Sequence, residues 1–347
     1  MMNCELRQLN TFIKSCSTSN AAIKNTASPI PKEGWYPAYS ASGQDVWLPE
    51  YRYSGKGIVV SAVGARCGKC FQADGKWNVT ANTHVLLVDE SIADYKYCWY
   101  LLNNESWWIK SGSGQPFVKV KDSLNRSILL PDLSTQQHIA TILDKISEGI
   151  ALCRKMMDEL ELMVKSGFSE LFYSQKYPIL KWNEVFSTTT GKLDSNAAVV
   201  NGKYPFFTCS KEILRIDEYA FDQEALLLAG NNASGKYDVK YYNGKFNAYQ
   251  RTYVLTLKEK WSYRLFQCQL EEKLEYLQQK SLGGLTKYLT LKILEELSFV
   301  IPPKEKQNEF EIFILKINKS KLTIQRIRDK MEMEKLALMQ EYFGREV

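Results

Sequence analysis

The 347-residue sequence has no run of about 18 apolar residues, so it predicts no helix that spans a membrane. Its first residues, MMNCELRQLNTFIKS, lack the apolar segment of a secretion signal, and we expect a cytoplasmic protein. The eight cysteines are scattered without a framework, which suits a reducing compartment. The net charge of +6 is compatible with a polyanionic partner but does not require one.

The residue groups that catalysis usually needs are also missing. The two histidines, His84 and His138, have no nucleophile and acid that accompany them in both halves of the chain. We find no Asn-Pro-Pro-aromatic motif of base methylation, no helicase or nuclease signature and no prominent pair of carboxylates. We therefore predict no catalytic residue and no cofactor in this chain.

Two short motifs suggest chemistry but match it poorly. Cys67 and Cys70 have the spacing of a redox or zinc pair, yet only Cys98 and His84 are nearby as further zinc ligands. Segment 230–236 nearly spells a phosphate-binding loop, but a tyrosine follows its lysine where Ser or Thr is needed, and strand-like sequence comes next. We interpret both motifs as turns and predict no metal site.

Two long stretches have the pattern of helices that pair along a narrow apolar face. Residues 134–173 contain no proline, and their apolar residues recur at steps of three and four; residues 304–343 behave similarly. So narrow an apolar face requires a partner helix. We predict antiparallel pairing within the chain, and pairing with another chain is the alternative. The predicted pairing residues are Ile139, Ile142, Ile146, Leu160, Phe310, Phe313, Ile317, Ile324 and Ile327.

The segment before each long helix repeats one order of motifs. The tetrapeptide GWYP at 34–37 returns as GKYP at 202–205. A proline followed five residues later by a glutamine occurs at 131–136 and again at 302–307. The sequence therefore contains an internal repeat, in the order globule, long helix, globule, long helix.

Strands and shorter helices are expected within each repeat. Asp74-Gly75 and Asn243-Gly244, each between strand-like arms, predict type I′ hairpins. A short helix is expected near the start of residues 1–33. The other expected elements are strands at 58–64, 85–88 and 254–257, and helices at 92–110 and about 262–279; residues 128–131 are expected to close the first unit.

The predicted fold class is α+β, with two mixed α/β domains related by a pseudo-two-fold internal repeat. The domains are expected at residues 1–133 and 176–301. They are joined by two long antiparallel coiled-coil helices, expected within 134–175 and 302–347.

Loops at equivalent places in both repeats are rich in cationic, amide, hydroxyl and aromatic side chains. Arg and Lys can bind guanine, Asn and Gln can bind adenine, and other cations can neutralise phosphates. For each residue, an ordinary solvated surface is the alternative. The DNA-binding candidates in the first repeat are Tyr39, Ser40, Ser42, Arg66, Lys69, Lys76, Asn78, Ser113, Gln115, Lys119 and Lys121. Those in the second are Thr208, Ser210, Lys211, Asn231, Asn232, Lys236, Lys245, Asn247, Arg251, Thr286 and Lys287.

Nearly the whole chain resembles the specificity subunits of bacterial and archaeal type I restriction–modification systems. The most specific segments are ILLPDLSTQQHIATILDKI at 128–146 and SFVIPPKEKQNEFEIFILKI at 298–317, with the tyrosine–proline openings at 36–42 and 204–210. In that family, two target-recognition domains alternate with two long helical regions.

The resemblance implies a non-enzymatic scaffold in which each recognition domain reads one half of a bipartite double-stranded DNA target. The helices would set the spacing and dock two adenine-methyltransferase subunits, and a motor-nuclease restriction subunit would join them. S-adenosylmethionine, ATP and Mg²⁺ would be bound by those partners. The first alternative is a two-domain adaptor that binds a protein or glycan through the same loops. The second is an enzyme that uses Cys67 and Cys70 or segment 230–236.

Overall fold

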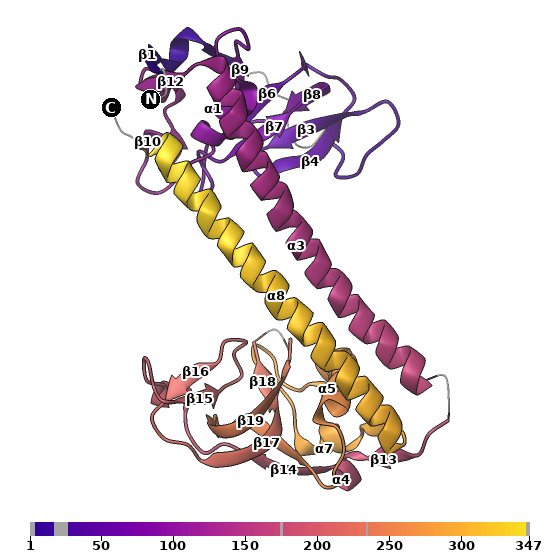
Figure 1. The fold of residues 1–347 in the computed structure, drawn as a ribbon. Coiled ribbons are helices and arrows are strands. Elements are labelled where there is room, and N and C mark those ends of the chain that lie inside the picture. The colour runs from indigo at the N-terminus through magenta and orange to yellow at the C-terminus, as the bar shows by residue number, and fades with distance from the viewer. Residues whose placement is uncertain (1–3, 17–26, 174–175, 234, 345–347) are drawn as a thin grey trace. The chain divides into compact units, whose positions relative to one another are not determined.

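The computed structural model describes residues 4–16, 27–173, 176–233 and 235–344, and its contacts divide the chain into two compact units. The first unit comprises Met1–Cys153 and Ile327–Val347, and the second comprises Arg154–Arg326. The boundary between them falls within both long helices, α3 (Leu133–Tyr173) and α8 (Lys304–Phe343). Each unit therefore combines its own sheets and short helices with part of α3 and part of α8 (Figure 1).

The first unit has an antiparallel four-stranded sheet at its core. All residues of its strand β6 are buried, because β6 lies between two neighbouring strands and is covered on both faces. A short helix, α1, shares this core through its buried aromatic and aliphatic side chains. The sheet order is β2 (Ile13–Cys16), β9 (Thr83–Val88), β6 (Gly57–Ser61) and β7 (Cys70–Ala73), and the helix is α1 (Tyr95–Leu102).

A second sheet of the first unit is organised around Trp77. The indole is fully buried, stacks on Tyr53 with ring centroids 4.6 Å apart, and donates a hydrogen bond to the carbonyl of Gly55 at 2.8 Å. The sheet order is β4 (Gly43–Leu48), β3 (Tyr36–Ser40), β8 (Lys76–Val79) and β5 (Tyr53–Ser54), with β3 and β8 parallel. The remaining elements are β1 (Cys4–Gln8), η1 (Leu9–Thr11), β10 (Lys110–Ser111), β11 (Phe117–Val118), α2 (Val120–Leu124) and β12 (Ser127–Pro131).

The second unit repeats this arrangement with its two sheets merged into one. The merging strand is β19 (Val239–Ala248), which is long enough to pair with β17 (Phe221–Ala229) along most of its length and with β15 (Tyr204–Phe207) at its end. The sheet order is β14 (Phe186–Thr190), β20 (Thr252–Leu257), β17, β19, β15 and β16 (Leu214–Ile216). The remaining elements are β13 (Ile179–Lys181), α4 (Trp182–Val185), η3 (Ser195–Ala197), β18 (Asn231–Asn232), α5 (Tyr263–Glu272), α6 (Leu274–Lys280), β21 (Lys287–Tyr288), α7 (Leu291–Glu295) and β22 (Ser298–Val300).

Both predicted type I′ hairpins are wrong. Asp74-Gly75 joins β7 to β8, which lie in different sheets and do not pair with each other. Asn243-Gly244 lies within the continuous strand β19. Both glycines have positive φ, +75° at Gly75 and +130° at Gly244. Gly75 lies where the chain passes from β7 to β8, whereas Gly244 lies inside the ladder of β19 with β17, opposite Gln223.

Three predicted helices also need correction. Near the N-terminus the chain forms β1, η1 and β2 instead of a helix, because β1 pairs with β12 and β2 pairs with β9; residues 1–3 and 17–26 lie outside the described residues. The helix expected at 92–110 is only α1, since the chain turns after Asn103 and buries Trp108. The helix expected at about 262–279 is divided at Lys273 into α5 and α6. The predicted strands at 85–88 and 254–257 are confirmed, and the strand expected at 58–64 ends earlier, at Ser61 of β6.

In the first unit, α3 and α8 pack together in antiparallel directions. Lys335 of α8 donates a hydrogen bond to the hydroxyl of Ser147 at 2.7 Å. One turn along, Gly149 leaves room for Met331, whose Cε would lie only 2.3 Å from a Cβ at that glycine. From Ser147 to Gly149 the residue numbers on α3 increase, while those of the contacting residues on α8 decrease from Lys335 to Met331, so the two helices are antiparallel.

The second unit shows the same antiparallel pairing with an aromatic contact. Phe310 meets Phe168 and Phe172 edge to face, at centroid distances of 5.7 and 5.2 Å. Lys321 forms an ion pair with Glu161 at 3.5 Å. The predicted fold class, two mixed α/β domains with two long packed helices, is confirmed.

The predicted pairing residues are mostly covered. Ile139, Ile146, Phe310, Ile317 and Ile324 are buried, and Ile142, Leu160 and Phe313 are half-buried. Ile327 is 48% exposed, which contradicts its assignment to the apolar face. After Ile324, steps of four and three lead to the half-buried Arg328 and Met331, so Ile327 falls beside the apolar face.

Candidate nucleic-acid interface

In the first unit, two of the predicted DNA-binding loops lie against each other. The glycine turn after β6 is held to the loop between β10 and β11, because the Gly64 amide donates to the Pro116 carbonyl at 2.9 Å and the Val118 amide donates to the Ala62 carbonyl at 2.9 Å. The side chains of Arg66, Ser113, Gln115, Lys119 and Lys121 are exposed on or beside these loops, and Lys69 is half-buried.

The second unit brings the equivalent loops together in the same way. Strand β18 pairs with β21, with Asn231 opposite Tyr288 and Asn232 opposite Lys287. The Leu289 amide donates to the Gly230 carbonyl at 2.8 Å, as Val118 does to Ala62 in the first unit. Lys236, Arg251 and Thr286 are exposed on or beside these loops, while Asn231, Asn232 and Lys287 are half-buried.

The remaining candidates lie on the second sheet of the first unit and its equivalent in the second. The most buried of these candidates form hydrogen bonds to the protein's own backbone. The hydroxyls of Ser40 and Thr208 accept hydrogen bonds from the amides of Ser42 and Ser210, at 3.0 and 3.2 Å. Tyr39 is half-buried, and burial, followed by the charge of Asp74, raises the pKa of its hydroxyl.

Asn78 and Asn247 likewise bind backbone. Their side-chain amides donate to the carbonyls of Glu50 at 2.8 Å and Glu218 at 3.2 Å. Each Oδ1 accepts a hydrogen bond from the amide of the following residue at 2.9 Å. The exposed candidates on these sheets are Ser42, Lys76, Ser210, Lys211 and Lys245.

Four tyrosines that are not among the DNA-binding candidates lie beside two of these lysines. In the first unit, Tyr36 and Tyr51 meet edge to face, and the ammonium of Lys76 lies 4.8 Å from the ring centroid of Tyr51. In the second unit, the same contacts are formed by Tyr204, Tyr219 and Lys245. Only the internal repeat could have revealed them, since the three members of each cluster are far apart in sequence.

The two weak motifs are structural turns. Cys70 is buried, its thiol donates to the carbonyl of Leu102 at 3.2 Å, and burial raises its pKa, which disfavours the reactive thiolate. Within the described residues, no group of three or more His, Cys, Asp or Glu side chains is placed to hold a metal ion. After segment 230–236 comes strand β19 instead of the helix that a phosphate loop needs; residue 234 lies outside the described residues.

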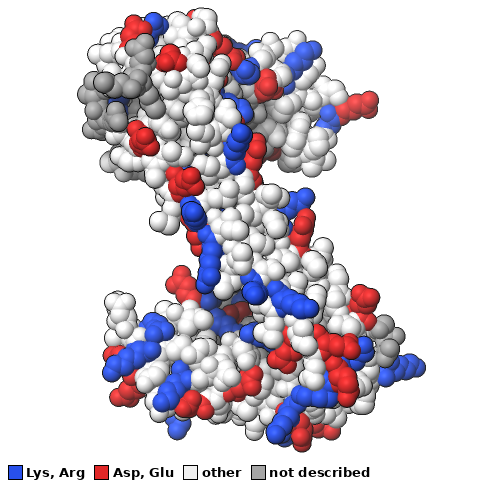
Figure 2. Space-filling model, viewed as in Figure 1, with Lys and Arg blue, Asp and Glu red and all other residues white. Residues whose placement is uncertain are grey.

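Charge does not divide the visible surface into regions of one sign. Figure 2 shows Lys and Arg side chains interspersed with Asp and Glu over both units on this face. None of the helices in the described ranges is both long and apolar enough to cross a membrane.

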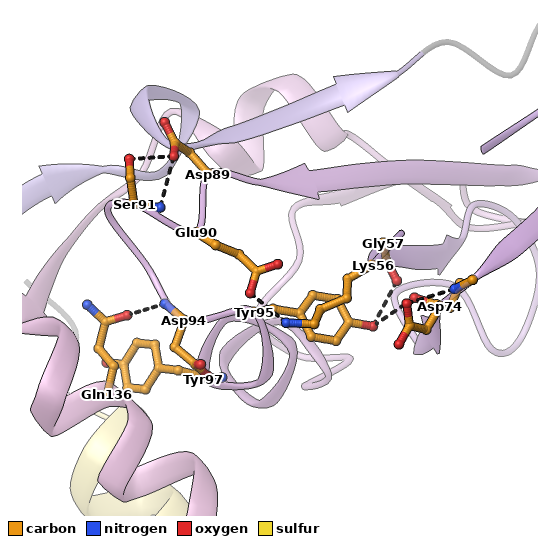
Figure 3. Close-up of polar contacts among 12 residues, drawn as sticks. Lys56, Gly57, Asp74, Asp89, Glu90, Ser91, Asp94, Tyr95, Tyr97 and Gln136 are labelled. Carbon is orange, nitrogen blue, oxygen red and sulfur yellow. Dashed lines mark hydrogen bonds and ion pairs between the residues drawn. The ribbon is translucent and has the colours of Figure 1, made fainter. Parts of the chain in front are cut away.

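A glutamine connects the long helix to the recognition unit at each proline–glutamine step. Gln136 of α3 is fully buried; its Nε2 donates to the Pro131 carbonyl at 2.8 Å, and its Oε1 accepts from the Asp94 amide at 2.8 Å (Figure 3). Asp94 is the N-cap of α1, so one side chain fixes the start of α3 to the start of α1. Tyr95, the next residue, donates its hydroxyl to the Gly57 carbonyl at 2.9 Å and so ties α1 to β6.

The second unit has the same junction. Gln307 of α8 is buried; its Nε2 donates to the Pro302 carbonyl at 2.9 Å, and its Oε1 accepts from the Ser262 amide at 2.9 Å. Ser262 is the N-cap of α5. The proline–glutamine step therefore forms the same rigid joint between a long helix and a domain helix in both units.

Comparison with known families matches the chain twice to the type I restriction modification DNA specificity domain, over residues 10–162 and 176–333. These two regions make up most of the chain, so the chain belongs to this family. It is a non-catalytic specificity subunit with two target-recognition domains.

Known relatives agree with this assignment. The type I restriction enzyme EcoDI specificity subunit of Escherichia coli is 39% identical over 127 residues, which is 36% of this chain and 27% of that protein. The match thus spans about a quarter of the length of that curated relative.

Two solved structures share the fold. The S subunit of a type I restriction–modification system from M. genitalium covers 100% of this chain and 97% of its own, with a TM-score of 0.71 and 16% identity. A structure described as the basis of complex assembly and conformational transition of the type I R-M system covers 97% of this chain and 99% of its own, with a TM-score of 0.52 and 13% identity.

Proposed function

We propose that each unit binds one half of a bipartite double-stranded DNA target and that α3 and α8 fix the number of base pairs between the halves. The observation that carries this proposal is the loop pair that recurs in both units, 64–69 with 112–121 and 230–236 with 283–287. Its cationic and amide side chains can bind base edges and phosphates, and two separate units can bind two separate half-sites.

Partner subunits supply the chemistry in this proposal. Two adenine-methyltransferase subunits bind S-adenosylmethionine, a motor-nuclease subunit binds ATP and Mg²⁺, and the assembly works on DNA in the cytoplasm. The present chain recognises the DNA sequence and holds the partner subunits together.

Apolar residues on the outward side of α8 support methyltransferase docking. In the second unit Ile312, Leu315 and Leu322 are all more than half exposed, and in the first unit so are Met333 and Leu336. Their positions follow heptad steps, which is the pattern of a helix face that packs against another protein.

A binding selection tests the DNA proposal. The chain, purified with its methyltransferase subunits, should enrich a two-part motif with a fixed gap from random duplex DNA. Affinity should fall steeply between low and moderate salt, because several phosphates are neutralised in each unit. Selection of no gapped motif, with a flat response to salt, would favour the adaptor for a protein or glycan instead.

A substitution on α8 tests docking separately. Leu315→Glu with Leu322→Glu should reduce co-purification of methyltransferase subunits at least tenfold while the chain remains folded. Lys316→Glu, on the same helix but outside the apolar face, is the matched control. Equal co-purification of both variants would contradict docking at this face.

A further inference from the structure

Each unit carries a surface cluster of two tyrosines and one lysine with nearly the same geometry. Tyr36 and Tyr51 have centroids 4.9 Å apart at an interplanar angle of 62°, and Tyr204 and Tyr219 have centroids 5.1 Å apart at 62°. The lysine ammonium lies 4.8 Å from the second ring in the first unit and 4.7 Å in the second. We call these the tyrosine–lysine clusters: Tyr36, Tyr51 and Lys76, and Tyr204, Tyr219 and Lys245.

The clusters face solvent although the residues beside them are core. Trp77 follows Lys76 on β8 and is fully buried, and Phe246 follows Lys245 on β19 and is also fully buried. Because side chains alternate along a strand, both lysines point outward. Tyr51 is 44% exposed and Tyr219 is 45% exposed, so each cluster presents a ring and an ammonium group at the surface.

An ion pair does not explain why the cluster recurs. The cross-strand neighbour of Lys76 is Ser54, whereas that of Lys245 is Asp222. What the two units share is the aromatic platform under the lysine. A cation over an exposed aromatic ring stabilises a fold only weakly, so stability alone is a weak reason for a repeated surface cluster.

The units have different loop sequences, as expected if they read different half-sites. A feature with the same geometry in both units cannot encode that difference. The ligand common to both half-sites is the sugar–phosphate backbone, to which an ammonium and a phenolic hydroxyl are suited as donors. We propose that the tyrosine–lysine clusters bind DNA phosphates, one cluster to each half-site, and supply affinity without sequence preference. This inference rests on the proposed function.

Lysine variants of the full chain, assembled with its methyltransferase subunits, test the proposal. Lys76→Ala or Lys245→Ala should weaken binding to target and to unrelated duplex by the same factor, about fivefold near physiological salt, since one phosphate contact is lost. Each should also reduce the slope of log affinity against log salt by about one, and the double variant by about two.

Tyrosine variants test the platform. Tyr51→Leu or Tyr219→Leu should weaken binding as the neighbouring lysine variant does, because the ammonium group is no longer held. Tyr51→Phe and Tyr219→Phe keep the ring and should retain most of the affinity. Circular dichroism and thermal unfolding must show that each variant is folded.

Lys14→Ala and Lys292→Ala are matched controls, because both lysines are exposed and lie outside the clusters. They should leave the salt slope unchanged. If the wild-type complex selects a gapped target but the Lys76 and Lys245 variants keep its slope, the cluster proposal is overturned alone. If these variants bind target DNA more weakly but bind unrelated DNA as the wild type does, the lysines contact bases, and the cluster proposal is likewise overturned. If the wild type itself binds no DNA, the proposed function fails.

Discussion

The glycine that opens the repeated GxYP motif is required for a different physical reason in each unit. Gly34 has φ of +74°, a conformation that L-residues rarely adopt, but a Cβ there would meet no atom within 4 Å. Gly202 has no such φ, but a Cβ there would lie 2.5 Å from the backbone nitrogen of Ile216. One motif position thus meets a conformational requirement in one unit and a packing requirement in the other.

Alanine at the two positions should therefore destabilise the protein unequally. Gly34→Ala forces a left-handed conformation and should cost about 1–2 kcal/mol. Gly202→Ala pushes β16 away from its neighbours and should cost more, about 3 kcal/mol, as overpacking of a buried backbone contact. Denaturant unfolding of both variants measures the difference. Gly34→Asn is the control and should remain closer to wild type than Gly34→Ala, because Asn tolerates positive φ; equal losses for Gly34→Ala and Gly202→Ala would contradict this account.

At the residue scale, the sequence identified the charged members of the tyrosine–lysine clusters but not their tyrosines. Lys76 and Lys245 can be identified from the sequence because each directly follows a repeated dipeptide, Asp74-Gly75 or Asn243-Gly244. Tyr51 and Tyr219 come from separate segments and reach the lysines only across the sheet, so no local pattern indicates them. The burial of Ser40 and Thr208 could not be predicted from the sequence either, because exposed turns and buried turns use the same residue types.

At the scale of elements, the glutamine junctions are the most exact part of the repeat. Each buried side-chain amide accepts from one backbone N–H and donates to one or two backbone carbonyls, so truncation removes all of these hydrogen bonds. Gln136→Ala and Gln307→Ala should each lower the free energy of unfolding by about 1–3 kcal/mol. Gln137→Ala and Asn308→Ala, which replace exposed neighbours, should change it by less than about 0.5 kcal/mol.

A looser junction should also relax the recognised spacing. In a binding assay on targets whose gap is one base pair shorter or longer than the selected one, Gln136→Ala should discriminate less well than Gln137→Ala. A purely structural role would lower stability and leave the ratio of affinities for the three gaps unchanged.

The elements themselves were predictable where one period dominates. The 3.6-residue period gave both long helices, and short apolar runs gave strands such as β9 and β20. The hairpin predictions were wrong because a positive-φ glycine also occurs in a connection between two sheets, as at Gly75, and within a continuous strand, as at Gly244. The N-terminal helix failed because pairing of β1 with β12, 119 residues or more away in the register, overrides local preference.

For the whole molecule, the paired helices are the element on which spacing and assembly both depend in the proposed function. Within each unit the pairing contacts combine apolar burial with polar contacts, such as Lys335 with Ser147 and Lys321 with Glu161. Polar residues along an otherwise apolar seam favour one register, because a slipped pair would leave them without partners. A fixed register is what the proposed scaffold for two half-sites needs.

Charge introduced into this seam should therefore disturb both functions together. Ile146, in the first unit, and Ile324, in the second, are each at most 9% exposed, so Ile146→Asp or Ile324→Asp buries a carboxylate without a partner. Each should destabilise the protein by several kcal/mol, reduce methyltransferase co-purification and weaken discrimination between gap lengths. Lys155→Asp, at an exposed position of α3, should do none of these. Normal assembly and normal gap discrimination by both isoleucine variants would show that the helices do not act as the spacer.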